Sequence, residues 1–589
     1  MSAFPLMRTK WTNEHVMAAL FAVLTLYGIP TWIKDPSKIL IFIIIIAVSL
    51  ITDTALNFVH FKKPVCAVSA AVTGAMLFVL APQAKLPALI IGVLIALILG
   101  KHAWGGTGKN IINPAITGYL AMVLLFRTPL PGFEPSWLLL PAILLGLPFI
   151  LSRPFASIGF MIGMTAQLAL LGALSPASLI SYGVLFLGCL VLTDPVTITL
   201  NPIAGGIAGL LAGLLSLMNG PSPLAIALPI LGLNIVSFAA DRLVYSPTGP
   251  LKRLLHIKPL IAMDNVRYLN LTREPDEAGV SVYDAYEGDI LELIKFSGVF
   301  GMGGAGFPTI RKVETVIRAN APQKYLIING VECDPGLIHD KWLMMNHVDE
   351  ISTGVELLKK CIGFSAAILA VKNPEGLQYP DSVRIHKITD YYPAGAEKTL
   401  ISEVLGVSLG DKEIPAERGI LVLNVQTVYA VYEAVMRNKK AATRFLTVAD
   451  IRHNEGVVAK VGLDMKIRDI IDKIYPNTAY AFSGGGIMQA KQAEDDDIVG
   501  QNVNLIASAR FPRYKESLQC SQCGQCVMHC PIGLQVNKIT ECMDKGNSSA
   551  VKKYHPEKCI SCGSCSYVCL AGRNLSARVR SAKDYMEKM

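Results

Sequence analysis

The sequence predicts an α-helical polytopic membrane domain, followed by soluble α/β domains and a small cysteine-rich domain at the C-terminal end. Three observations lead to this fold class. Residues 1–246 carry only 12 Lys/Arg and 6 Asp/Glu, whereas the remaining 343 residues carry 42 and 39. Gly-rich and strand-like segments follow between residues 291 and 495. Eight of the thirteen cysteines then form two regular runs within the last 70 residues. An apolar part that suits a lipid bilayer is therefore joined to ordinary soluble protein.

Composition also excludes several classes of function. The net charge of +9 is spread along the chain and forms no basic block, so we expect no nucleic-acid partner. No Ser/His/Asp or metal-hydrolase constellation is present, which argues against hydrolytic chemistry. The first apolar stretch is followed by more of the same, so a cleavable signal peptide is not expected.

The membrane domain contains about ten apolar spans. They lie near residues 15–33, 38–58, 64–82, 86–100, 111–126, 136–151, 155–174, 178–193, 203–218 and 223–240. Several are shorter than the ~20 residues that an upright helix needs, so we expect some tilted, broken or re-entrant helices.

Charge in the loops predicts the orientation of these spans. With the N-terminus in the cytoplasm, ten spans return residue 241 to the same side, and the inner segments carry ten Lys/Arg against four outside. That bias obeys the positive-inside rule. We therefore expect a multi-pass protein of the inner (cytoplasmic) membrane with its soluble part in the cytoplasm, which is also a compartment that keeps thiols reduced.

A few polar residues fall inside this apolar domain. They are Asp53, Asp194 and the Gly-rich segment 105–110, which leads into Asn113-Pro114. One interpretation is a cofactor or ion site, since polar groups at membrane depth are often functional. The other is helix capping and hydrogen bonding between helices, and the pattern does not separate the two. Cys66 and Cys189 are isolated and are interpreted as packing residues.

The soluble part opens with a Gly-rich segment, residues 298–309, that contains G-x-G-x-x-G. Such glycines let backbone N–H groups approach a phosphate closely, although a purely structural turn is the alternative. A strand at 326–328 leads into residues 329–336, and a later strand at 420–423 ends at residues 424–427.

The last 70 residues contain two runs of the form C-x2-C-x2-C-x3-C. The ligands are Cys520, Cys523, Cys526, Cys530, Cys559, Cys562, Cys565 and Cys569. This is the spacing of a ferredoxin-like two-cluster domain, in which each run gives three thiolates to one [4Fe–4S] cluster and its fourth to the other. Paired zinc sites are the alternative. The iron–sulfur interpretation predicts a protein that moves single electrons.

These motifs together resemble the C subunit of the Rnf electron-transport complex from about residue 296 to residue 571. The matching segments are GVFGMGGAGFPT, NGVECDPG, YYPAGAEKTLISEVLG, LVLNVQTVYAV and the two cysteine runs. The first four also resemble the flavin- and NADH-binding subunit of respiratory complex I. The resemblance implies FMN and NAD(H) as further cofactors, with Lys312 near a phosphate and a β-grasp-like module following the flavin domain. It implies these cofactor-binding residues: Gly301, Gly303, Gly304, Gly306, Phe307, Lys312, Asn329, Glu332, Asp334, Asn424 and Thr427.

The membrane part resembles the D subunit of Rnf and the B subunit of the sodium-pumping NADH:quinone reductase. The segments that carry this resemblance are KHAWGGTGKNIINPAITG, AVTGAMLFVLAP and TDPV. The chain therefore resembles a natural fusion of D and C subunits. It departs from those families in three ways: it lacks an S-G-A-T flavin attachment motif, it has only a short connector before the flavin domain, and it has Leu570 where a Pro is usual. Any second flavin, in the membrane domain, is therefore expected to be non-covalent.

The expected domains are 1–246 (membrane), 247–290 (connector), 291–450 (FMN and NAD(H) binding), 451–495 (β-grasp-like) and 510–580 (two [4Fe–4S] clusters). The resemblance implies an NADH-linked oxidoreductase in an ion-translocating Rnf-type complex, with the other membrane subunits and ferredoxin or a similar carrier as partners. The alternative, which the missing S-G-A-T motif favours, is a stand-alone membrane-tethered NAD(P)H reductase that feeds a quinone, an extracytoplasmic acceptor or a corrinoid without pumping. A non-enzymatic scaffold is disfavoured by the eight intact ligand cysteines.

Overall fold

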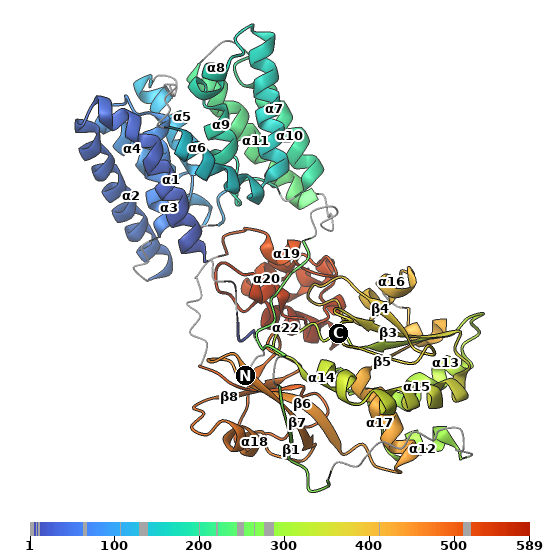
Figure 1. Cartoon of the computed structure of the whole chain (residues 1–589). Coiled ribbons are helices and arrows are strands. Elements are labelled where there is room, and N and C mark those ends of the chain that lie inside the picture. The colour runs from blue at the N-terminus through green and yellow to red at the C-terminus, as the bar shows by residue number, and fades with distance from the viewer. Residues whose placement is uncertain are drawn as a thin grey trace.

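The computed structural model describes residues 5–588, apart from 8, 10–11, 63–66, 107, 129–138, 200, 219–221, 244–252, 264–265, 276–287, 305, 411–412 and 511–519. Cys66 and residue 107 of the Gly-rich membrane segment lie outside the described residues. A helical bundle forms one end of the molecule, two sheets form the other, and the cysteine-rich domain lies between them (Figure 1).

Every apolar span expected from the sequence contains a helix. The helices are α1 (Asn13–Lys34), α2 (Ser37–Phe61), α3 (Val68–Leu80), α4 (Leu86–Ile98), α5 (Pro114–Phe126), α6 (Leu140–Gly146), α7 (Pro154–Leu170), α8 (Pro176–Ser181), α9 (Val184–Phe186), α10 (Pro202–Leu215) and α11 (Pro223–Leu243), with short helical turns η1 (His102–Trp104), η3 (Leu147–Ser152) and η4 (Leu187–Val191). Within the described residues, four helices are long and apolar enough to cross a membrane, and five apolar helices are shorter. The eighth span is broken into α8, α9 and η4, as expected for a short span.

Small residues allow the bundle to pack tightly. A Cβ on Gly163 of α7 would lie 2.3 Å from the carbonyl oxygen of Leu210 in α10, and a Cβ on Gly213 would lie 2.3 Å from that of Phe160. Close backbone approach of this kind is typical of helices that associate in lipid. The outward side chains are large and apolar, for example Leu124, which is 65% exposed, and Ile203, which is 73% exposed. The helical part is therefore a membrane domain.

The first soluble sheet has four parallel strands in the order β4-β3-β2-β5. The strands are β2 (Tyr325–Asn329), β3 (Ala366–Val371), β4 (Arg384–Lys387) and β5 (Ile420–Asn424), and the helices are α12 (Ile290–Phe296), α13 (Thr309–Arg318), α14 (His339–Asn346), α15 (Val348–Ile362), α16 (Glu397–Leu405), η5 (Pro415–Arg418) and α17 (Val425–Met436). Nearly continuous apolar runs such as β5 fit strands that are buried on both faces. Because β2 and β5 pair in register, Asn329 and Asn424 end at the same edge of the sheet.

The second sheet has six strands in the order β1-β7-β6-β10-β8-β9, with α18 (Ile467–Ile474) packed on it. The strands are β1 (Arg267–Asn270), β6 (Thr443–Asp450), β7 (Glu455–Gly462), β8 (Ala481–Gly484), β9 (Lys491–Gln492) and β10 (Leu505–Ser508). The sheet thus extends on both sides of residues 451–495 and takes β1 from the segment expected to be a connector. A strand of four residues gives little sequence signal, and the pairing of β1 with β7 comes from tertiary contact.

The cysteine-rich domain repeats a short helix after each run begins. It contains α19 (Gln525–Met528), α20 (Val536–Asp544), η6 (Ser548–Tyr554), η7 (Pro556–Lys558), α21 (Ser564–Tyr567) and α22 (Leu575–Glu587). Gly524 and Gly563 precede α19 and α21 with φ of 75° and 79°, a conformation that favours glycine.

Both ends of the membrane domain attach to the soluble part. Before α1, the amides of Leu6, Thr9 and Asn13 donate to the carbonyl oxygens of Ile487, Tyr567 and Leu570, at 3.0, 3.2 and 2.9 Å. After α11, the amide of Arg253 donates to the carbonyl oxygen of Met528 at 2.9 Å. The bundle therefore leaves and re-enters the soluble part on one side.

Candidate functional site

The eight cysteines of the two runs form two groups of four. Burial raises the pKa of the Cys523 thiol to about 11, and the nearby thiols of Cys520 and Cys569 act in the same direction. Burial likewise raises the pKa of Cys562 to about 12, with Cys530 and Cys559 adding to it. We call Cys520, Cys523, Cys526 and Cys569 the first quartet, and Cys530, Cys559, Cys562 and Cys565 the second quartet. The last cysteine of each run therefore belongs to the same quartet as the first three cysteines of the other run, as the spacing predicts.

Backbone amides point at sulfur atoms of the first cysteine run. Leu534 N donates to Cys530 Sγ at 3.2 Å, and Gln522 N donates to Cys520 Sγ at 3.4 Å. Hydrogen bonds to the thiolate sulfurs are typical of iron–sulfur sites, so the two quartets fit [4Fe–4S] clusters.

The two quartets face different parts of the molecule. On the second quartet, the carbonyl oxygen of Cys562 accepts from Tyr392 Oη at 2.5 Å, and a Cβ on Gly563 would lie 2.3 Å from the carbonyl oxygen of Met488. The second quartet therefore contacts loops of the two soluble sheet domains.

The first quartet contacts the membrane domain. The Arg153 guanidinium donates to the carbonyl oxygens of Cys523 and Gln522, at 3.4 and 3.1 Å. A Cβ on Gly108 would lie 1.8 Å from the carbonyl oxygen of Cys520, so this glycine, with φ of +82°, permits a backbone contact that no other residue would. The Gly-rich membrane segment thus contacts the backbone of the first cysteine run directly.

The soluble Gly-rich loop is held from two sides. Its ends are joined by Gly301 N to Phe307 O at 2.8 Å and Gly306 N to Gly301 O at 3.1 Å. Inside the loop, Met302 N donates to Thr427 Oγ1 at 2.9 Å, and Arg444 Nη2 donates to Met302 O at 3.1 Å. The loop is thereby fixed with its glycines at the strand ends.

Two glycines leave the loop backbone open to a ligand. Gly304 has φ of +112°, and a Cβ added there would meet nothing closer than Asn504 Nδ2 at 3.9 Å. A Cβ on Gly303 would lie 3.4 Å from Cβ of Asn424. The structure therefore brings the loop together with Asn424 and Thr427; their contact with a flavin stays what the resemblance implies. Asn329 lies beside them, since Asn424 Nδ2 also approaches Asn329 O at 3.4 Å.

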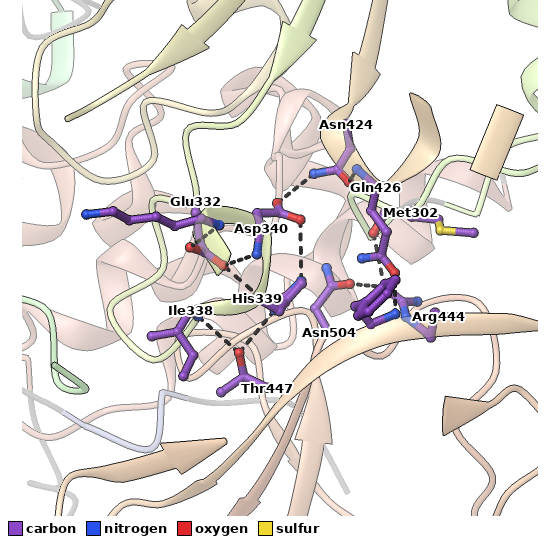
Figure 2. A network of polar contacts seen from close by, with 12 residues as sticks. Met302, Glu332, Ile338, His339, Asp340, Asn424, Gln426, Arg444, Thr447 and Asn504 are labelled. Atoms are coloured by element: carbon purple, nitrogen blue, oxygen red, sulfur yellow. Dashed lines mark hydrogen bonds and ion pairs between the residues drawn. The ribbon is translucent and has the colours of Figure 1, made fainter. Parts of the chain in front are cut away.

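A buried polar network lies next to the loop (Figure 2). Glu332 accepts from the amides of Asp340 and Lys341 at 2.8 and 3.1 Å, at the start of α14. Asp340 accepts from Asn424 Nδ2 at 2.7 Å, and His339 lies within 3.7 Å of Glu332 and 3.6 Å of Asp340. Burial raises the pKa of Glu332 to about 8 and that of Asp340 to about 6, and it lowers the pKa of His339 to about 3, so the imidazole is neutral.

Three buried atoms of this network have no hydrogen-bond partner among the described residues. They are Asp340 Oδ1, Gln426 Nε2 and Arg444 Nε. Native proteins rarely leave such atoms unpaired, so a polar ligand fits here. His339, Asp340 and Arg444 were not predicted from the sequence, because each is a single residue outside the quoted motifs. Gln426 was not predicted either, although it lies within LVLNVQTVYAV, two residues after the end of β5.

Two predicted site residues make structural contacts. Asp334 accepts from the amides of Ile487, Met488 and Gly336 at 2.9, 3.0 and 3.0 Å, which joins the first sheet domain to the segment before β9. Lys312 Nζ donates to Glu397 Oε1 at 2.9 Å and to Val422 O at 3.4 Å, and the side chain is 28% exposed. Their roles toward a cofactor stay predictions, as does that of Phe307, which is 44% exposed.

In the membrane domain, Asp53 and Asp194 are hydrogen-bonded within the bundle. Asp53 is buried and accepts from Lys101 Nζ and His102 Nε2, both at 2.8 Å, and from Asn57 Nδ2 at 2.9 Å. Asp194 accepts from the amide of Val196 at 3.1 Å and lies within a turn. Asp53 is thus paired within the bundle and links α2 to the turn after α4.

Comparison with known proteins agrees with both halves of the resemblance. Residues 1–140 match the NQR2, RnfD, RnfE family, and residues 294–433 match the Nuo51 FMN-binding domain. The chain is similar to the C subunit of the ion-translocating oxidoreductase complex of Rhodobacter capsulatus, with 27% identity over 280 residues, 45% of this chain and 54% of the relative. It is also similar to the C subunit of the Na(+)-translocating ferredoxin:NAD(+) oxidoreductase complex of Acetobacterium woodii, with 27% identity over 43% of this chain and 60% of the relative.

The chain spans about half the length of the curated relatives it matches. A solved NAD+-reducing [NiFe]-hydrogenase in the air-oxidized state is 17% identical with a TM-score of 0.38, over 54% of this chain and 71% of that chain, which is too weak a likeness to support an argument. The two family matches and the relatives confirm the resemblance to a D-type membrane part joined to a C-type soluble part.

Proposed function

We propose, starting from this union of D-type and C-type parts in one chain, that the protein is a membrane-bound NADH-linked oxidoreductase. It passes electrons between NAD(H) and a ferredoxin or membrane carrier, as one component of an ion-translocating Rnf-type complex. One observation carries the proposal: the cysteine-rich domain lies between the flavin-type domain and the membrane domain, and each of its quartets contacts one of them.

The chain's own residues supply the binding sites. The two quartets provide four thiolates each for [4Fe–4S] clusters; Cys526 and Cys530 are buried and the other six cysteines are partly buried. The loop from Gly301 to Phe307 offers backbone amides to the FMN phosphate, and Thr427 and Arg444 hold it in place. Asn329, Asn424 and Glu332 line the same strand edge for the flavin and the nicotinamide. Bound flavin accepts two electrons at once and releases them singly, which the one-electron clusters require.

The membrane arrangement is part of the same proposal. Both ends of the helical domain meet the soluble part, which supports an even number of crossings such as the expected ten, with the soluble part in the cytoplasm. A cavity of about 230 Å³ lies between the membrane domain and the first quartet, lined by Lys109, Arg153 and Asn201 among others. We propose it as the place for a second, non-covalent redox group. The domain boundaries given above belong to this proposal as well.

An anaerobic NADH titration of the detergent-purified chain tests the function. Flavin absorbance and low-temperature EPR are recorded together at each addition. We expect the flavin to bleach and two interacting [4Fe–4S]⁺ signals to develop. Clusters that respond to dithionite but not to NADH, with no flavin bound, would contradict the proposed nucleotide and flavin site.

A purification under mild conditions separates this function from a stand-alone reductase. Other membrane subunits that copurify in fixed ratio are expected for an Rnf-type complex. A chain that purifies alone and reduces a quinone with NADH or NADPH would favour the stand-alone reductase instead.

A further inference from the structure

We propose that Arg153, a residue of the membrane domain, raises the reduction potential of the cluster held by the first quartet above that of the other cluster. This inference rests on the proposed function, because it takes both quartets to hold clusters. It makes the membrane domain a part of the electron path and more than an anchor.

Arg153 connects the two domains at one point. It directly precedes α7 and is 3% exposed. Its Nε donates to Ile198 O at 2.9 Å and its Nη2 to Pro195 O at 2.6 Å, both in the membrane domain. On its other side, Nη1 and Nη2 donate to the carbonyl oxygens of Cys523 and Gln522. Carbonyl partners on both sides fix the guanidinium against the first cysteine run.

Charge at this point favours the reduced state of the first cluster. Reduction adds one negative charge, and a fixed cation in a buried, low-dielectric setting stabilises that charge. Arg153 is close enough to Cys523 for the two groups to interact electrostatically, and the carboxylates of Asp194 and Asp241 act on Arg153 from the membrane side. The positive charge therefore reaches the cluster only when the two domains are docked.

The other cations near the quartets are weaker candidates. Arg573 also acts on Cys520 and Cys569, but it is ion-paired with Asp544, which also binds Arg578. Near the second quartet, Lys583 Nζ donates to Cys559 O at 3.2 Å from a partly exposed position. Among the residues that the structure describes, Arg153 is thus the cation that contacts a quartet from another domain. It is a positioning residue, since it does not ligate the cluster and acts on it by its charge.

A redox titration followed by EPR on the full-length protein in detergent tests this. In Arg153→Gln, we expect the reduced-to-oxidised ratio of the first cluster at a fixed potential to fall about tenfold, which is a shift of about 59 mV for one electron. The reduction potential of the second cluster should not change. Arg153→Lys keeps the charge and should restore most of the potential. Variants Cys569→Ser and Cys530→Ser identify which signal belongs to which quartet.

Two further variants keep the test decisive if Arg153→Gln does not fold. Asp241→Asn removes a carboxylate whose negative charge offsets the positive charge of Arg153. The reduction potential of the first cluster should therefore rise in this variant. Lys583→Met should lower the reduction potential of the second cluster and leave that of the first unchanged. Potentials unchanged in both Arg153→Gln and Asp241→Asn, or an equal shift of both clusters, would overturn the inference. Absence of both cluster signals from the unmodified protein would overturn the proposed function, and this inference with it.

Discussion

Thr427 shows how a single hydroxyl can fix a binding loop. It is fully buried, and its Oγ1 accepts the amide of Met302 in the middle of the Gly-rich loop. Thr427→Val would leave that amide unpaired, at a cost of about 1–3 kcal/mol. We expect FMN affinity to fall by about tenfold or more, measured by fluorescence titration of the flavin-depleted protein. Thr427→Ser keeps the hydroxyl and should bind FMN normally; equal FMN affinity in the Val variant would show that the loop does not hold flavin.

The raised pKa of Glu332 predicts that the stability of the folded protein depends on pH. Its pKa is about 8 in the folded protein against about 4.3 in an unfolded chain, so the folded state binds more protons between these values. Stability should therefore fall as the pH rises from about 4 toward 8. Glu332→Gln removes this contribution, and its stability relative to the wild type should improve with increasing pH. Thermal unfolding at pH 5 and pH 8 measures the difference, and a relative loss at pH 8 would contradict the assigned shift.

At the residue scale, sequence predicts the site only where a motif or a strand end marks it. Asn329 and Asn424 follow recognisable strands, and parallel pairing brings them to one edge. Arg444 and Asp340 have no such mark, because they meet the loop through packing between two sheets. Asp334 sits within a conspicuous segment, yet its oxygens contact backbone amides, so a motif identifies the segment better than the role of each residue.

At the scale of elements, the crossed quartets predict which cluster each cysteine supports. Cys569→Ala should abolish the same cluster as Cys523→Ala, and Cys530→Ala the same cluster as Cys562→Ala, while flavin stays bound. EPR and iron content measure the outcome. Pairing of Cys569 with the second run would contradict the quartets, and equal loss of flavin and both clusters in Cys523→Ala would argue against separable sites.

The pairing of Asp53 with Lys101 predicts a large effect on the stability of the bundle. Asp53→Asn leaves a buried ammonium uncompensated, which typically costs about 3–5 kcal/mol. We expect a lower unfolding temperature in detergent, and the double variant Asp53→Asn, Lys101→Met should recover part of it. Asp194→Asn serves as a control with a smaller effect. An unchanged unfolding temperature in Asp53→Asn would mean that the pair is not what links α2 to the turn after α4.

Element positions in the membrane domain follow closely from the sequence, because apolar runs bounded by Pro, Asn and Lys mark the helices directly. The soluble elements were less visible. β1 has four residues and is a strand only through its neighbour β7, and the six-stranded sheet combines segments that lie far apart in the chain. Local pattern cannot reveal pairing that depends on the rest of the fold.

At the scale of the whole molecule, the backbone contact at Gly108 predicts that this position controls docking of the membrane domain on the cysteine-rich domain. Gly108→Val would place side-chain atoms against the Cys520 carbonyl and strain a backbone with φ of +82°. We expect faster hydrogen exchange at residues 520–526. Gly232→Ala is the matched control, since a Cβ there meets nothing within 4 Å. Exchange that is equal in both variants would show that this contact does not hold the domains together.

The order of domains along the chain was predictable from composition and motifs, but their placement was not. Nothing in the linear sequence shows that the first quartet turns toward the membrane and the second toward the sheets. That choice depends on Arg153, Gly108 and Tyr392, which come from three separate parts of the chain.

The hydrogen bonds of Leu6, Thr9 and Asn13 have a consequence for biosynthesis. Their partners, Ile487, Tyr567 and Leu570, lie far later in the chain, beyond the whole membrane domain and the first soluble sheet. The segment ahead of α1 can therefore dock only after these later segments have been synthesised and folded. We expect its docking to follow the folding of the cysteine-rich domain.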